Sequence, residues 1–329
     1  MTPSLLLAAL AITQPGSGPP PIPDLPPEDV YRLFTPLEYS ASGGGSPDKK
    51  VYRYRLFEPA YGSPGEKYPM IVWLHGIGQV EIDGPENLGQ LKWLGLIFKT
   101  AQRDDYPFFL LAMQLPKDQR QWFYRAGEIR ADEPITVLWE IVKTTFQDYP
   151  VDEDRICLVG LSGGGSACWE MAMRHPVSFA AITPLASGGG DHLRAGLLRD
   201  VPVWAFHSNG DGPEGDRRTV AAVNRAGGTA KLSEPMISSH HCWPAAFEQN
   251  HLLPWLLAQR RGAWSVPPGV LPWRLRLAEV IRSGNWWKYV VVVVVLLLVV
   301  VAVRQERRRQ ARTQHDERGR WRPEEGVEP

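Results

Sequence analysis

The sequence predicts an α/β fold in which a mostly parallel central sheet is covered by helices on both faces. The clearest observation is a strand, a tight glycine-rich turn and a helix in direct succession near the middle of the chain. Further short apolar runs read as buried strands, and each is followed by a polar loop that carries reactive side chains. The central part of the chain, about two hundred residues long, is also large enough to bury the core of one such domain.

The chain begins with segments that are expected to lie outside the sheet. Residues 1–13 are a candidate signal peptide, because residues 5–12 are apolar and a possible small-residue cleavage site lies near Ala9-Leu10-Ala11. Residues 14–36 contain QPGSGPPPIPDLPP, which is typical of an extended proline-rich spacer. The catalytic domain is then expected over residues 37–262. Its opening residues 37–40 and 51–57, separated by SGGGSPDK, predict a β-hairpin.

Residues 68–74, YPMIVWL, are uniformly apolar and predict a buried strand that leads into His75-Gly76-Ile77-Gly78. A His-Gly-x-Gly turn after a central strand can present backbone N–H groups toward a reacting carbonyl oxygen. Ile77 is therefore the expected second donor of an oxyanion hole. His75 is expected to brace the turn rather than to transfer protons.

The strand predicted at residues 156–159 runs into Gly160-Leu161-Ser162-Gly163-Gly164, and helical spacing begins at Ser166. A serine at the apex of such a turn is a candidate nucleophile, and glycines two positions away on each side leave room for the neighbouring strand and helix. The N–H of Gly163, at the helix start, can point at a developing oxyanion. The alternative is a glycine-rich turn that only packs closely.

Two further buried strands are followed by the partners that a nucleophilic serine needs. Residues 201–207 predict a strand, and Asp211 in the loop after it is the candidate acid, with Asp216 as the alternative. Residues 230–233 predict the last strand, and the loop beyond it holds two candidate bases, His240 and the alternative His241. The chain order serine, aspartate, histidine differs from the chymotrypsin and subtilisin orders and matches one hydrolase architecture.

From residue 51 to residue 262 the chain resembles the α/β-hydrolase superfamily, and within it the bacterial esterases related to polyhydroxybutyrate depolymerases, feruloyl esterases and dienelactone hydrolases. The resemblance is carried by YPMIVWLHGIG, LAMQLPKDQRQW, DRICLVGLSGGGSACWEMAMRHPVSFAAITPLASGGGD, VPVWAFHSNGD and SSHHCW with LLPWLLAQRRG after it. It implies an α/β-hydrolase fold and a serine esterase that acts on small-molecule or polymeric esters and needs no metal or organic cofactor.

The resemblance also implies roles for individual residues: Ser162 as the nucleophile, Asp211 as the acid and His240 as the base. The family pattern Gly-His-x-x-Trp aligns with the run SHHCW that begins at Ser239, which favours His240 over His241. This chain departs from the pattern where Ser239 replaces a glycine, His241 replaces a frequent aspartate and Ser208 replaces a glycine. The first two departures leave the choice of histidine open.

Composition excludes some other classes of function. Lys plus Arg and Asp plus Glu both number 36, so the net charge is zero and no basic field suited to nucleic acid is present. Three cysteines cannot form a closed disulfide framework, and we expect them to be small core residues. Nothing in the sequence identifies a protein partner.

The end of the chain predicts attachment to a membrane. After a last domain helix expected around residues 245–260, residues 263–285 form a juxtamembrane segment rich in tryptophan and proline. Residues 286–303 predict a transmembrane helix, because residues 290–303 read VVVVVVLLLVVVAV with aromatic residues before them. The arginine-rich tail, residues 304–329, is expected to be disordered and cytoplasmic, which places the catalytic domain outside the cytoplasm in a single-pass cell-membrane protein.

Two other functions fit the same sequence. A prolyl-oligopeptidase-like serine peptidase would share the nucleophile turn and the order of the triad, although those enzymes usually add a large propeller. A catalytically inactive, membrane-tethered binding domain would tolerate the loss of a reacting group, whereas every reacting group is present here.

Overall fold

The computed structural model describes residues 27–41, 50–59, 65–79, 94–98, 107–249 and 251–262. The chain separates into two compact units, Met1–Leu271 and Pro272–Pro329, and all described residues belong to the first. The predicted signal peptide, transmembrane helix and tail therefore lie outside the described residues. Within the described ranges, no helix has the length and apolar character needed to cross a membrane.

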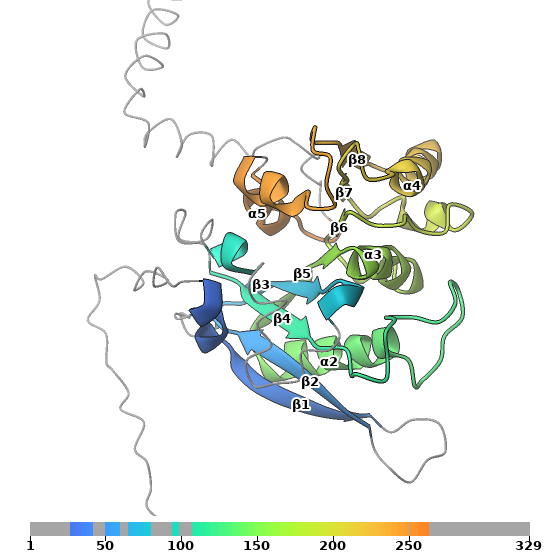
Figure 1. Cartoon of the computed structure of the whole chain (residues 1–329). Coiled ribbons are helices and arrows are strands. Elements are labelled where there is room, and N and C mark those ends of the chain that lie inside the picture. The colour runs from blue at the N-terminus through green and yellow to red at the C-terminus, as the bar shows by residue number, and fades with distance from the viewer. Residues whose placement is uncertain are drawn as a thin grey trace, which may run out of the picture. The chain divides into compact units, whose positions relative to one another are not determined.

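The described residues form one eight-stranded sheet in the spatial order β1-β2-β4-β3-β5-β6-β7-β8 (Figure 1). Its strands are β1 (Thr35–Ala41), β2 (Lys50–Phe57), β3 (Tyr68–Leu74), β4 (Phe109–Met113), β5 (Val151–Leu161), β6 (Ala181–Leu185), β7 (Val203–Phe206) and β8 (Ala230–Ser233). The pairs β1–β2 and β2–β4 are antiparallel, and the remaining described pairs are parallel. Strand β2 alone among these strands therefore runs against the others.

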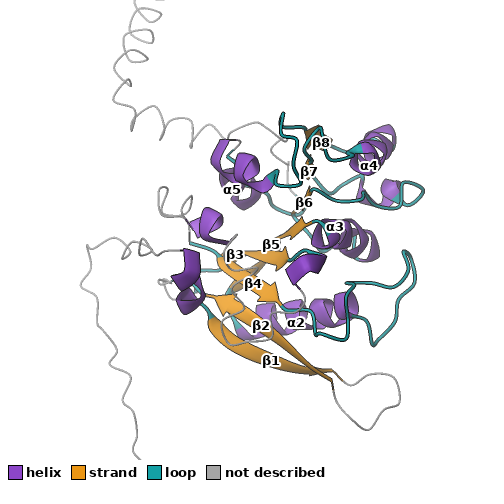
Figure 2. Ribbon diagram, in the orientation of Figure 1, coloured by secondary structure: helices purple, strands orange, loops and turns teal. Residues whose placement is uncertain are grey.

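Helices cover both faces of this sheet (Figure 2). The α-helices are α2 (Pro134–Asp148), α3 (Gly163–Arg174), α4 (Glu214–Arg225) and α5 (Leu252–Leu257), and residues 94–98 are also helical. Short 3-10 helices occur at η1 (Pro27–Leu33), η2 (Ile77–Gln79) and η3 (Ala195–Leu198), and η4 (Ala245–Gln249) is a π-helix.

Alternate residues of the central strands supply the cores on the two faces. In β3, Val72 faces the core shared with α2, α3 and α4, whereas Trp73 faces the core shared with α5 and residues 94–98. Because both faces are buried, β3 is apolar at every position instead of alternating. This is why the run YPMIVWL identifies a central strand.

The predicted α/β architecture is confirmed in these elements. The strands expected at residues 68–74 and 230–233 have those bounds, and the opening hairpin forms between β1 and β2. The fold begins before residue 37, since Val30 and Phe34 are buried against one core although they were assigned to the spacer. The helix after the nucleophile turn begins at Gly163 rather than Ser166.

The single helix expected around residues 245–260 is wrong. The π-helix η4 and the helix α5 occupy this stretch as separate elements, and His251 before α5 has a left-handed backbone (φ 53°). A left-handed residue interrupts the helical hydrogen-bond pattern. The residues LLPWL of the short α5 are still buried, and its leucines and tryptophan pack in the core that α5 shares with residues 94–98.

Candidate active site

The described candidate residues follow the carboxyl ends of parallel strands, where open α/β sheets place their sites. Ile77 follows β3, Ser162 follows β5, Asp211 follows β7 and His240 follows β8. In the sheet, β3 adjoins β5, and β6 separates β5 from β7. The fold thus gathers residues that are up to 163 positions apart in the sequence at one edge.

Ser162 has a backbone conformation that non-glycine residues rarely adopt, with φ 57° and ψ −116°. The surrounding structure holds it there: its N–H donates to Leu185 O of β6 at 2.8 Å, and its own carbonyl accepts from Ser166 N at 3.0 Å. Such strain persists only where neighbouring contacts enforce it, and it is typical of functional sites. Ser162 also stands directly before α3, so its hydroxyl lies at a helix N-terminus.

The glycines beside Ser162 are required by close backbone contacts. A Cβ on Gly160 would lie 2.2 Å from Gly164 O, and a Cβ on Gly164 would lie 2.0 Å from Leu74 O. Both distances are far below van der Waals contact, and both involve backbone atoms that cannot rotate away. The glycines therefore let β3, β5 and α3 approach closely enough to form the turn.

The two expected oxyanion donors lie side by side. A Cβ built on Gly163 would be 2.5 Å from Ile77 Cγ1 and 3.7 Å from Ile77 N. Gly163, the residue directly after Ser162, therefore packs against Ile77. Ile77 itself is half-exposed, which leaves this side of the turn accessible to a ligand.

His75 braces the turn that carries Ile77. Its Nδ1 donates to Gly76 O at 2.8 Å, and its Nε2 accepts the Leu115 N–H at 3.0 Å. The Trp122 indole N–H donates to His75 O at 2.9 Å, and Trp122 is buried in the core. Burial lowers the pKa of His75 to about 4, which keeps the ring neutral and able to accept from Leu115.

The structure brings Asp211 and His240 into direct contact. His240 Nδ1 lies 2.5 Å from Asp211 Oδ2, and the His240 side chain is 44% exposed. The loops after β7 and β8 are packed together, since a Cβ on Gly210 would be 3.1 Å from Ser238 Cα. With Nδ1 directed at the carboxylate, Nε2 is the ring atom left to exchange a proton with a substrate or nucleophile.

The neighbouring histidine is placed differently. The His241 ring lies 4.6 Å from the Trp243 ring, and its backbone N–H donates to Ser239 Oγ at 3.4 Å. The buried Cys242 anchors the loop at this point, because its thiol donates to Phe206 O at 3.3 Å. Burial raises the pKa of Cys242 to about 12, so it is a protonated anchor and not a nucleophile.

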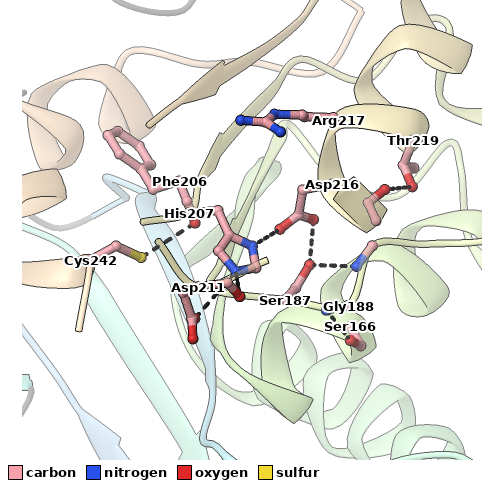
Figure 3. A network of polar contacts seen from close by, with 12 residues as sticks. Ser166, Ser187, Gly188, Phe206, His207, Asp211, Asp216, Arg217, Thr219 and Cys242 are labelled. Atoms are coloured by element: carbon pink, nitrogen blue, oxygen red, sulfur yellow. Dashed lines mark hydrogen bonds and ion pairs between the residues drawn. The ribbon is translucent and has the colours of Figure 1, made fainter. Parts of the chain in front are cut away.

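Asp216, the alternative acid, belongs to a separate buried cluster (Figure 3). Its Oδ2 accepts from His207 Nδ1 at 2.8 Å. Its Oδ1 accepts from Ser187 Oγ at 2.5 Å and from the Trp169 indole N–H at 3.0 Å. These partners occupy the carboxylate, and Asp216 is fully buried. In this arrangement Asp211, not Asp216, is the carboxylate that contacts a candidate base.

His207 joins the two aspartates (Figure 3). Besides its bond to Asp216, its Nε2 lies 3.1 Å from Asp211 O and 3.3 Å from Asp211 Oδ2. Burial alone would lower the pKa of His207, but the hydrogen bond and negative charge of Asp216, with those of Asp211, raise it overall. The sequence pattern places His207 only at the end of a predicted strand. The feature of the sequence that could have indicated its role is its position directly before a loop that contains two aspartates.

Comparisons with known proteins agree with this fold. No protein-family profile and no curated relative matches the chain at the sequence level. Among solved structures, a thermostable esterase is 27% identical, with a TM-score of 0.61, over 70% of this chain and 64% of the esterase. This chain therefore matches just under two thirds of that esterase's length.

Two further structures show the same fold at lower identity. A ferulic acid esterase is 15% identical, with a TM-score of 0.52, over 68% of this chain and 97% of that enzyme. An acylaminoacyl peptidase from Pyrococcus horikoshii is 11% identical, with a TM-score of 0.50, over 71% of this chain and 43% of the peptidase. The strand order and these likenesses define an α/β-hydrolase fold, which this chain shares with two esterases and an acylaminoacyl peptidase.

Proposed function

We propose that this protein is a serine hydrolase that cleaves carboxylic esters, with Ser162 as nucleophile, His240 as base and Asp211 as the acid that orients it. The observation that carries the proposal is the combination of a strained serine at a strand-to-helix turn with a histidine–aspartate contact of 2.5 Å on the same sheet edge. The likeness to a thermostable esterase supports an ester substrate.

The proposed reaction has two steps. His240 Nε2 accepts the Ser162 hydroxyl proton while Oγ attacks the ester carbonyl carbon, and the N–H groups of Gly163 and Ile77 stabilise the oxyanion. The carbon–oxygen bond to the alcohol then breaks, and His240 returns the proton to the leaving alcohol. Water attacks the acyl-enzyme with His240 again acting as base, which releases the acid and regenerates Ser162.

The test is hydrolysis of p-nitrophenyl acetate and butyrate by the full chain. Ser162→Ala and His240→Ala should each lose at least about 10³-fold in kcat, because each removes a reacting group. Ser166→Ala and His241→Ala are the matched controls, and we expect both to retain turnover. Activity that survives Ser162→Ala, or that is lost in His241→Ala but kept in His240→Ala, would contradict the assignment.

Further assays distinguish this proposal from two alternatives, an inactive binding domain and a serine peptidase. A serine-directed fluorophosphonate should label the wild type and not Ser162→Ala, whereas an inactive binding domain should not be labelled at all. An acyl-amino-acid p-nitroanilide tests for peptidase activity, since the peptidase likeness at 11% identity concerns the fold alone. A panel of short-chain, feruloyl and acetyl-sugar esters then defines the acyl and alcohol groups.

We also propose that the domain is held at the outer side of the cell membrane by a helix over residues 286–303. The support is the uninterrupted apolar run at residues 290–303, with tryptophan and tyrosine before it and clustered arginines after it.

A further inference from the structure

We propose that His207 is a positively charged positioning residue, held doubly protonated between Asp216 and Asp211 so that it fixes the Asp211 carboxylate for His240. This inference rests on the proposed function, because it assigns Asp211 and His240 to the catalytic triad. It adds a second histidine–aspartate pair behind the first, in the order Asp216, His207, Asp211, His240.

The ring contacts of His207 require two N–H groups. Nδ1 faces Asp216 Oδ2 at 2.8 Å, and Nε2 faces the Asp211 backbone carbonyl at 3.1 Å. A carbonyl oxygen only accepts, so Nε2 must carry a proton. A neutral ring would then present a lone pair on Nδ1 to the lone pairs of Asp216, which is repulsive. Protonation at both nitrogens satisfies both contacts.

The surroundings of Asp216 require its carboxylate to be ionised. Its Oδ1 faces the indole N–H of Trp169, which can only donate, and the hydroxyl of Ser187, which itself accepts the Gly189 N–H at 3.0 Å. Oδ1 therefore has no acceptor for a proton, and the proton between Oδ2 and His207 Nδ1 lies on the imidazole, which is more basic than a carboxylate. A fully buried carboxylate needs a nearby positive charge, and His207 is the group in contact with it.

Other charged groups around this site are accounted for. Arg217, next to Asp216, directs its guanidinium at Glu234 and Glu214. Figure 3 draws no dashed contact from Arg217 to His207 or Asp216. The Cys242 thiol stays protonated, and burial together with the charges of Asp216 and Asp211 contributes to raising its pKa. Of the histidines in the following loop, His240 contacts Asp211, and His241 packs on Trp243.

A positive His207 affects His240 through their shared partner. Both rings contact Asp211 Oδ2, at 3.3 Å and 2.5 Å. Two groups on one oxygen lie within about 6 Å of each other, where two positive charges repel. A positive His207 therefore opposes a second positive charge on His240, the residue proposed to act as the base.

The test is the pH dependence of ester hydrolysis by the full chain carrying His207→Gln. Glutamine keeps a donor for one of the two aspartates but removes the charge. The acid limb of kcat/KM should move to higher pH, because a positive charge next to the base is removed, so the variant loses more activity at the acid end of the profile than on the alkaline plateau. Ser187→Ala is the matched control: it loosens the same cluster and should lower Tm without moving the limb.

If the acid limb of kcat/KM does not move in His207→Gln while Tm falls, the proposal is overturned and His207 is a packing residue. If the variant does not fold, ¹⁵N-histidine NMR of the wild-type chain decides the question. Both ring nitrogens of His207 should still be protonated above pH 6.5, where a free histidine has lost one proton, and loss of one proton at or below pH 6.5 would overturn the proposal. The NMR readout does not need turnover, so an inactive wild type would refute the proposed function alone.

Discussion

At the scale of the residue, three histidines at one sheet edge differ in protonation because their hydrogen-bond partners differ. His75 has a carbonyl on one nitrogen and a backbone N–H on the other, so it is neutral. His207 has acceptors on both nitrogens, which favours the charged form. His240 has a carboxylate on Nδ1 and an exposed ring, which suits a base that must gain and lose a proton.

The neutral state of His75 should appear in the stability of the protein. Its pKa falls from 6.5 when unfolded to about 4 when buried, so the unfolded chain binds more protons between these values. Stability is therefore lost as pH falls from about 6.5 to 4, by roughly 3 kcal/mol from this group.

Urea denaturation between pH 4 and pH 7 measures this loss. His75→Gln should show a shallower dependence on pH than the wild type, while the exposed His192→Gln should keep the wild-type slope. His175, whose pKa burial also lowers to about 4, contributes to the slope in both variants. Equal slopes in wild type and His75→Gln would show that His75 is not held neutral.

At the scale of the element, the strand-turn-helix unit of β5 and α3 is defined by how closely its backbone approaches β3. The Cβ positions of Gly160 and Gly164 are occupied by backbone carbonyls, so this unit tolerates no side chain there. The turn at η2 does not have this constraint at Gly78. A Cβ on Gly78 would have open space around it, and Gly78 has no positive φ.

Gly164→Ala should therefore destabilise the protein by about 3 kcal/mol or more, because a methyl group would overlap Leu74 O and His75 O. Gly78→Ala, in the adjacent turn, should change stability by less than about 0.5 kcal/mol. Thermal denaturation of the two variants makes the comparison, and a similar Tm for both would contradict the close approach.

At the scale of the whole molecule, the described domain is one sheet with a core on each face, and the charges of the full chain sum to zero. Its carboxyl-terminal end is tied back to β5 by Arg260 and Arg261, which pair with Asp152 and Asp154. These ion pairs hold the end of the described domain in place, and residues 263–285 separate it along the chain from the segment that we propose as the membrane anchor.

The proposed anchor makes a prediction for the full chain. Cells expressing it should retain it in the membrane fraction after alkaline carbonate washing, because a spanning helix is held by its apolar surface and not by charge. Deletion of residues 286–303 should release the protein into the supernatant. Deletion of residues 304–329 is the control and should leave it in the membrane. Full-length protein in the supernatant would refute the anchor.

The sequence by itself determined the α/β class, the central strands and the serine turn, because each has a local pattern: a continuous apolar run, or glycines at fixed spacing. It also determined the chain order of serine, aspartate and histidine. Only the tertiary structure decided that Asp211 contacts His240, that Asp216 is buried with His207, and that the last helix is interrupted at His251. These outcomes depend on how the loops after β7 and β8 pack against each other. Such packing joins residues distant in the chain, and it leaves no periodic pattern along the sequence.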